Sequence, residues 1–108
     1  MYEINVGLAR KGKPNLTLQQ ALRPFPAHGF ILTEARIEQS GTEPTLVARL
    51  QPPTREFDME RALLEVSRVL EQDCIALYLP HKLGGYGWLV GDRADKWGPF
   101  NLAFFIRS

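Results

Sequence analysis

The stretch from Met59 to Leu79 constrains the fold more than any other part of the chain. Apolar residues recur every three or four positions from Met59 to Leu70, which is the spacing of one face of an α-helix. Asp58, directly before this stretch, is a suitable N-cap. Every position from Cys74 to Leu79 is then apolar, as in a central strand covered on both faces. A helix followed at once by a buried strand predicts a sheet with a helix packed against it.

Alternating patterns predict the other strands. Residues 2–8 alternate with a period of two, which is typical of a half-buried strand. Residues 30–39 and 45–50 flank the turn SGTEP and predict a hairpin with a charged outer face. Pro80 is expected to end the buried strand, and Tyr86 to Val90 is expected to form a fifth strand. The residues expected to face the core are Tyr2, Ile4, Val6, Leu8, Ile31, Thr33, Ala35, Ile37, Leu46, Ala48 and Leu50.

A shorter helix is expected between the first two strands. Thr17 and Gln20 have the spacing of a capping box, which predicts that a helix begins at Leu18. Pro24 lacks an amide hydrogen and should kink or break this helix. Gly29 is suited to the left-handed conformation that closes a helix.

The expected order is therefore strand, helix, strand, strand, helix, strand, with an added strand and a C-terminal tail. Its first six elements form a ferredoxin-like, split βαβ sandwich, so the predicted fold class is α+β. A chain of 108 residues has the size of a single domain, 1–108. This fold carries many unrelated functions, so function must come from particular residues.

The octamer GGYGWLVG, from Gly84 to Gly91, resembles the RNA-binding signature of RRM domains. In that family the signature lies on the third strand, before the second helix, whereas here it follows the second helix. Tyr2 imitates the family's second motif, but it lies on the expected core face, where it cannot stack on RNA. We therefore reject the RRM interpretation. The matching positions are Gly85, Tyr86, Gly87, Trp88 and Leu89.

The glycines of this octamer have a structural interpretation. Gly85, Gly87 and Gly91 leave one face of the strand nearly bare, which allows a ring or another backbone to approach closely. The tail that follows is rich in rings, so we expect it to pack on this face. Its aromatic residues are Trp97, Phe100, Phe104 and Phe105.

The composition disfavours several classes of function. A net charge of +1, from 13 basic and 12 acidic residues, argues against binding through broad phosphate contacts. One cysteine, Cys74, and two histidines provide no metal-ligand spacing. We expect Cys74 to be an inert buried thiol, and we identify no catalytic residue, cofactor site or metal site.

Two loops are the candidate contact surface. Arg10, Lys11 and Lys13 form a small basic loop, which predicts at most weak, salt-dependent contacts with nucleic acid. The second loop places His81 and Lys82 beside the aromatic strand, and loops are favoured places for function. The full candidate set is Arg10, Lys11, Lys13, His81, Lys82, Tyr86 and Trp88.

Three stretches, EARIEQSGTEPTLVARL, QDCIALYLP and GDRADKWGPFNLAFFI, resemble small uncharacterised proteins encoded by phages, plasmids and integrated elements. The resemblance implies an accessory role in a bacterial cell. With no signal peptide or membrane span apparent, we expect a cytoplasmic, non-enzymatic protein that binds another protein. The alternatives are a nucleic-acid-binding module, using the sheet or the Arg10–Lys13 loop, and an enzyme or ligand-binding domain with a pocket under the tail. The sequence specifies neither the partner nor the oligomeric state.

Overall fold

The computed structural model describes residues 2–40, 43–81 and 84–92, with the backbone alone at residues 40, 79–81, 84–86 and 88. The strands are β1 (Tyr2–Gly7), β2 (Ile31–Ser40), β3 (Glu43–Gln51), β4 (Ile75–His81) and β5 (Gly84–Val90). The helices are α1 (Leu18–Leu22), α2 (Pro24–Ala27) and α3 (Met59–Val69).

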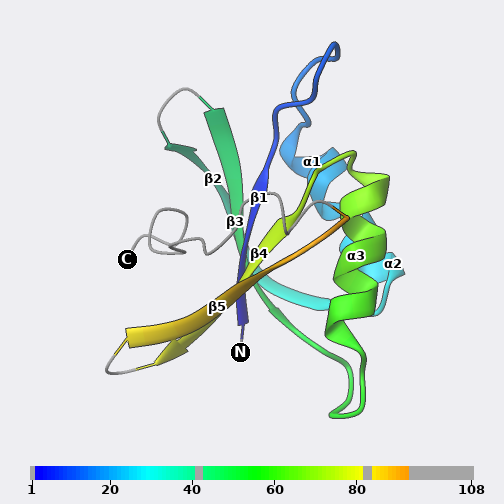
Figure 1. Ribbon diagram of the computed structural model, residues 1–108, viewed down its shortest axis with the longest axis vertical. Helices are drawn as coiled ribbons and strands as arrows, with labels where there is room; N and C mark the ends of the chain where they lie inside the picture. The colour runs from blue at the N-terminus through cyan, green and yellow to red at the C-terminus, as the bar shows by residue number, and fades with distance from the viewer. Residues whose placement is uncertain (1, 41–42, 82–83, 93–108) are drawn as a thin grey trace.

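The strands form one sheet in the order β2-β3-β1-β4-β5, and all neighbouring strands are antiparallel. Its first four strands have the order of the split βαβ arrangement, with β5 added as a hairpin partner of β4. The three helices lie on one side of the sheet (Figure 1). The predicted α+β class is confirmed, and β1 is the central strand.

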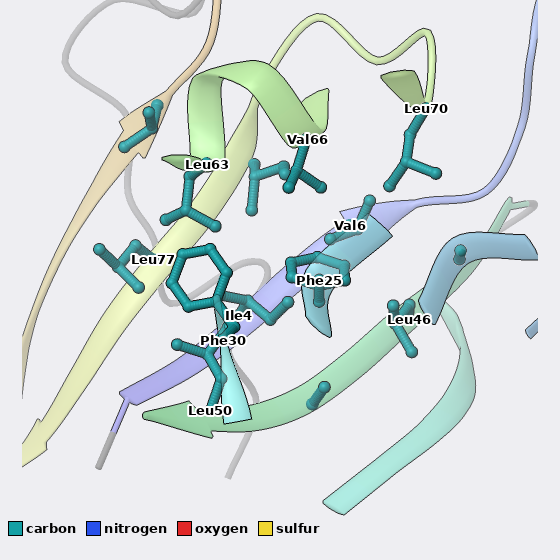
Figure 2. Close-up of a cluster of buried hydrophobic side chains, with 14 of the residues drawn as sticks. Ile4, Val6, Phe25, Phe30, Leu46, Leu50, Leu63, Val66, Leu70 and Leu77 are labelled. Carbon is teal, nitrogen blue, oxygen red and sulfur yellow. The ribbon is translucent and has the colours of Figure 1, made fainter. Parts of the chain in front are cut away.

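The core lies between the sheet and the helices. Leu63, Val66 and Leu70 point from α3 toward the side chains of β1 and its neighbours (Figure 2). Ile4 and Val6 are fully buried, as the alternation predicted. Phe30 contacts two further rings edge to face, with centroid distances of 6.0 Å to Phe25 and 5.2 Å to Phe57.

Helix α3 forms where its periodicity predicted. The Asp58 carboxylate caps it by accepting a hydrogen bond from the amide of Arg61. Val69 belongs to the apolar stripe by its spacing, but it is 59% exposed, so the buried face of α3 is narrower than the stripe. Glu65 and Arg68 have the spacing of a pair along the helix, but the ion pair that the structure gives Arg68 is with Asp92, at 2.7 Å.

The first helical segment is divided in two, as the prolines predicted. Thr17 and Gln20 form the capping box, with both reciprocal hydrogen bonds present. Pro24 is the first residue of the separate helix α2, a position that needs no amide donor. Its side chain is buried. Gly29 has φ +97°, so it closes this segment in the predicted left-handed conformation.

A register shift between Leu32 and Glu34 changes which residues of β2 face the core. The alternation predicted that Ile31 and Thr33 point inward. The bulge instead aligns Leu32 with Leu50 on the helix side, and Ile31 is 52% exposed. Beyond the bulge Ala35 and Ile37 are in register with Ala48 and Leu46, as the alternation predicted, but both are exposed and not part of the core.

The hairpin of β4 and β5 corrects one further expectation and agrees with another. Pro80 does not end the strand, because β4 continues to His81 and Pro80 is in register with Gly85. At Gly91, a Cβ atom would collide with the carbonyl oxygen of Asp73 and lie 2.5 Å from the Cα of Cys74. This glycine therefore allows close approach of the main chain before β4. The expected tail lies outside the described residues.

Candidate functional site

The sheet has a second face, opposite the helices, on which charged and small residues meet. In the described part of the chain no helix covers this face (Figure 1). The strand registers align Glu3 of β1 with Arg49 and Tyr78, and Asn5 of β1 with Val47 and Ala76. We call the following residues the second face: Glu3, Asn5, Glu34, Arg36, Glu38, Val47, Arg49, Ala76 and Tyr78.

Asn5 is the unusual residue at its centre. The side chain is 3% exposed, and neither its amide nitrogen nor its oxygen has a hydrogen-bond partner among the described residues. Val47 and Ala76 on either side are also 3% exposed, and their aliphatic side chains have no group that can donate or accept a hydrogen bond. An unpaired buried amide costs about 1–3 kcal/mol, so Asn5 needs a functional or structural explanation.

Glu3 lies two residues before Asn5 on the same face. Burial raises the pKa of the Glu3 carboxyl above its ordinary value, although Arg36 and Arg49 act in the opposite direction. Glu34 and Glu38 also raise this pKa. The five charged groups of the second face therefore interact electrostatically.

Four of these charges form two ion pairs across or along the strands. An Arg36 guanidinium nitrogen lies 2.6 Å from a Glu38 carboxylate oxygen, and Arg49 lies 3.7 Å from Glu34. Glu3 makes no ion pair with a described residue. The second face thus holds a carboxyl group and, two residues away, a buried amide, neither with an ion-pair or hydrogen-bond partner given among the described residues. Both groups have oxygen atoms that can accept hydrogen bonds from a donor-rich ligand.

The basic loop predicted as a contact surface is engaged within the molecule. Glu71 accepts from Lys13 Nζ at 2.8 Å and from Arg10 Nη1 at 3.3 Å. Arg10 also donates to the carbonyl oxygen of Pro14. Lys11 is exposed and makes no ion pair with a described residue. Two of the three predicted cations are therefore partly neutralised.

The other predicted contact residues follow the β4–β5 hairpin. His81 ends β4, and Lys82 lies outside the described residues. The register aligns Tyr86 with residue 79 and Trp88 with Leu77, a core residue. The side chains of His81, Tyr86 and Trp88 are among those that the structure does not describe. β4 is antiparallel to its neighbour β1, with Tyr78 in register with Glu3, so His81 lies toward the start of β1 and the basic loop follows its other end.

Cys74 has the properties expected of an unreactive thiol. Burial, the larger cause, and the neighbouring charge of Asp73 raise its pKa to about 11. The thiol is therefore protonated at neutral pH and is a poor nucleophile. Among residues 2–40, 43–81 and 84–92, no group of three or more acidic, histidine or cysteine residues is placed to hold a metal ion.

Two open hollows border the beginning of α3, with volumes of about 440 and 450 Å³. Asp58 and Glu60 line both of them. Asp58 is already used as the helix cap, so it is a weak candidate for ligand binding. The second face is the stronger candidate site.

Sequence reasoning missed Glu3 and Asn5 as candidates. The alternation of β1 places both residues opposite Ile4 and Val6, which suggests ordinary exposed positions. In the fold Asn5 lies between Val47 of β3 and Ala76 of β4 and is buried. Strand order depends on contacts distant in sequence, and no local pattern reports it.

Comparison with known proteins gives one structural similarity. No protein-family model and no curated protein sequence matches the chain. A solved structure of a phage SAM lyase in complex with S-methyl-5'-thioadenosine is similar, with a TM-score of 0.46 and 13% sequence identity. The alignment covers 82% of this chain and 88% of the lyase chain.

This similarity corrects one expectation and agrees loosely with another. The expectation that the protein is not an enzyme is contradicted, because the similar structure is that of an enzyme. The phage origin of that structure agrees with the expected resemblance to phage proteins. In the described part of the chain, no helix has both the length and the hydrophobicity that crossing a membrane requires. At this level of identity the likeness concerns the fold, and the lyase activity and its ligand are properties of the neighbouring protein.

Proposed function

We propose that the protein binds a partner protein through the second face of the sheet, by accepting an extended polypeptide segment. The observation that carries this proposal is the buried amide of Asn5, which has no hydrogen-bond partner among the described residues. A carboxamide offers a donor and an acceptor side by side, and a peptide group is complementary to both. Because Asn5 is 3% exposed, the residues around it must move apart for a partner backbone to reach the amide, and the new hydrogen bonds would then relieve the cost of leaving that amide without a partner.

Glu3 defines the side chain that the partner should present. Glu3 and Asn5 lie roughly 7 Å apart along the strand, from the rise of an extended chain. Since Glu3 has no ion-pair partner among the described residues, a lysine or arginine is its natural complement. The expected ligand is therefore an extended segment with a basic side chain near a free peptide group.

The charge of the face supports a protein rather than a nucleic acid. It carries three carboxyl groups, Glu3, Glu34 and Glu38, against the guanidinium groups of Arg36 and Arg49. Such a face repels a phosphate backbone, which requires a local excess of positive charge. The pairing of Lys13 with Glu71 weakens the alternative site on the basic loop in the same way.

A peptide-display selection tests this proposal directly. A library of random peptides is selected on the intact protein and on two variants, Glu3→Lys and Asn5→Val. We expect the wild type to enrich peptides with lysine or arginine at one position, Glu3→Lys to enrich aspartate or glutamate there, and Asn5→Val to lose binding at least about tenfold.

Glu60→Lys is the matched control, since it makes the same charge change on α3, away from the second face. It should leave the selected consensus unchanged. The proposal is wrong if no peptide is enriched, or if Glu3→Lys and Glu60→Lys select the same sequences as the wild type. A protein that binds RNA but no peptide would favour the nucleic-acid alternative.

A further inference from the structure

The outer edge of β2 is a further candidate interaction surface. β2 is an end strand of the sheet, and in the described part of the chain only β3 pairs with it. From Glu34 to Ser40 its register with β3 is regular, and residues 33–37 are all exposed. A long, exposed edge presents unpaired N–H and C=O groups that can pair with another strand.

The side chains along this edge are self-complementary. Arg36 and Glu38 flank Ile37 and point to the second face, whereas Ile37 points to the helix side and is 45% exposed. When two copies of such a strand pair in antiparallel orientation about Ile37, Arg36 of each copy lies opposite Glu38 of the other. The two isoleucines lie opposite each other on the helix side.

We propose that two copies of this chain associate through β2, in antiparallel register about Ile37, to form one continuous sheet of both protomers. Such a two-fold interface uses the same surface on each copy, so each favourable pair occurs twice. The existing Arg36–Glu38 ion pair, at 2.6 Å, then becomes half of a ring of four alternating charges. Each buried isoleucine adds apolar burial.

The bulge favours pairing about Ile37 over the alternative register, in which the strands pair about Ala35. Pairing about Ala35 also places Glu34 opposite Arg36 of the second copy. That register, however, brings the irregular backbone between Leu32 and Glu34 into the pairing. Pairing about Ile37 uses only the regular run from Glu34 to Ser40. Bulges commonly end pairing at a sheet edge, and here the bulge ends it on one side of the proposed interface.

Charge reversal tests the proposal by sedimentation equilibrium over a wide range of micromolar concentrations. We expect a monomer–dimer equilibrium for the wild type. Arg36→Glu places like charges opposite one another at two symmetric positions, as does Glu38→Arg. Each should weaken dimerisation by roughly tenfold or more.

Two complementing experiments separate the interface from a general loss of folding. The double variant Arg36→Glu, Glu38→Arg restores opposite charges and should recover most of the wild-type association. An equimolar mixture of the two single variants should form heterodimers, since one carries two acidic and the other two basic residues. Arg61→Glu, an exposed residue of α3, is the matched control and should dimerise as the wild type does.

A wild type that remains monomeric at every concentration overturns the proposal. A dimer that is equally stable in all variants also overturns it, because the interface then lies elsewhere. Arg36 and Glu38 also belong to the second face, but sedimentation equilibrium without added peptide measures association alone. Glu3→Lys and Asn5→Val leave the β2 edge intact and should dimerise as the wild type does.

Discussion

The ammonium nitrogen of Lys13 lies 2.8 Å from a carboxylate oxygen of Glu71, joining the basic turn after β1 to the residue just beyond α3. Glu71 adopts φ +58°, the left-handed conformation that usually closes a helix with glycine. Arg10 donates to the same carboxylate. An unfavourable backbone conformation is thus retained where its side chain holds two cations from a distant loop.

The Glu71 cluster predicts how stability depends on pH. Hydrogen bonds and charge from Lys13, with a smaller contribution from Arg10, hold the pKa of Glu71 below its ordinary value of 4.5. The folded state therefore binds this proton more weakly than the unfolded state. The stabilisation is present above pH 4.5 and is lost as the pH falls through the lowered folded pKa. Glu71→Gln should lower the free energy of unfolding at neutral pH and have little effect in strong acid.

Urea unfolding of both proteins at neutral and strongly acidic pH measures this difference. Glu56→Gln is a control on an exposed carboxyl outside the cluster. An equal effect of Glu71→Gln at both pH values would show that its charge is not responsible. High salt should reduce the neutral-pH difference, since the cluster is solvent-exposed.

Asn5→Val should stabilise the isolated protein. The substitution removes a buried amide with no partner among the described residues and adds a residue that favours strands. We expect the free energy of unfolding to rise by about 1 kcal/mol, measured by urea unfolding. Thr45→Val, a neighbouring change on β3, should have a smaller effect because Thr45 is only partly buried. A loss of stability in Asn5→Val would mean that the amide has a partner within the folded chain.

Gly91→Ala should destabilise the fold by about 1–3 kcal/mol, the usual cost of overpacking. The added Cβ would lie 2.9 Å from the Cβ of Cys74 and collide with the main chain of Asp73. Gly7→Ala is the control, because its Cβ would meet only the end of the flexible Gln72 side chain, at 3.3 Å. The melting temperatures of both variants, measured by thermal unfolding, test this prediction. Equal melting temperatures would contradict the close approach at Gly91.

Leu63→Ala should cost about 2–5 kcal/mol, the range for a buried leucine. Leu63 is fully buried and lies in the core between α3 and the sheet (Figure 2). Val69→Ala, on the same helix but 59% exposed, should cost less than about 1 kcal/mol. Urea unfolding of the pair therefore tests which face of α3 is packed. Similar losses of stability in both variants would show that the packed face of α3 is assigned incorrectly.

Elements whose signals are short-range could be predicted well from the sequence. The α3 stripe, the Asp58 cap and the Thr17–Gln20 capping box all depend on residues three or four positions apart. The inward set of β3, including Leu46 and Leu50, followed from simple alternation. Such patterns depend on the period of the local backbone, 3.6 residues in a helix and two in a strand. Tertiary contacts do not change that period in these elements.

The bulge of β2 could not be predicted from the alternation of its residues. Alternation placed Ile31 and Thr33 on the core side, but one extra residue before Glu34 shifts the earlier part of the strand. A single inserted residue reverses the facing of the positions before it. Nothing in the composition of this segment marks the shift, because it is set by the packing of Leu32 against the core.

The sequence by itself therefore determined the order of elements, the α+β class and the packed faces of its regular helix and strands. Only the tertiary structure decided that β1 is central and that Asn5 is buried between Val47 and Ala76, with no partner for its amide among the described residues. Only the tertiary structure brought Lys13 to Glu71, and so engaged the loop that the sequence presented as a contact surface. The physical reason is range: helix caps and alternation act over a few residues, whereas burial and charge pairing depend on neighbours that the folded chain brings together.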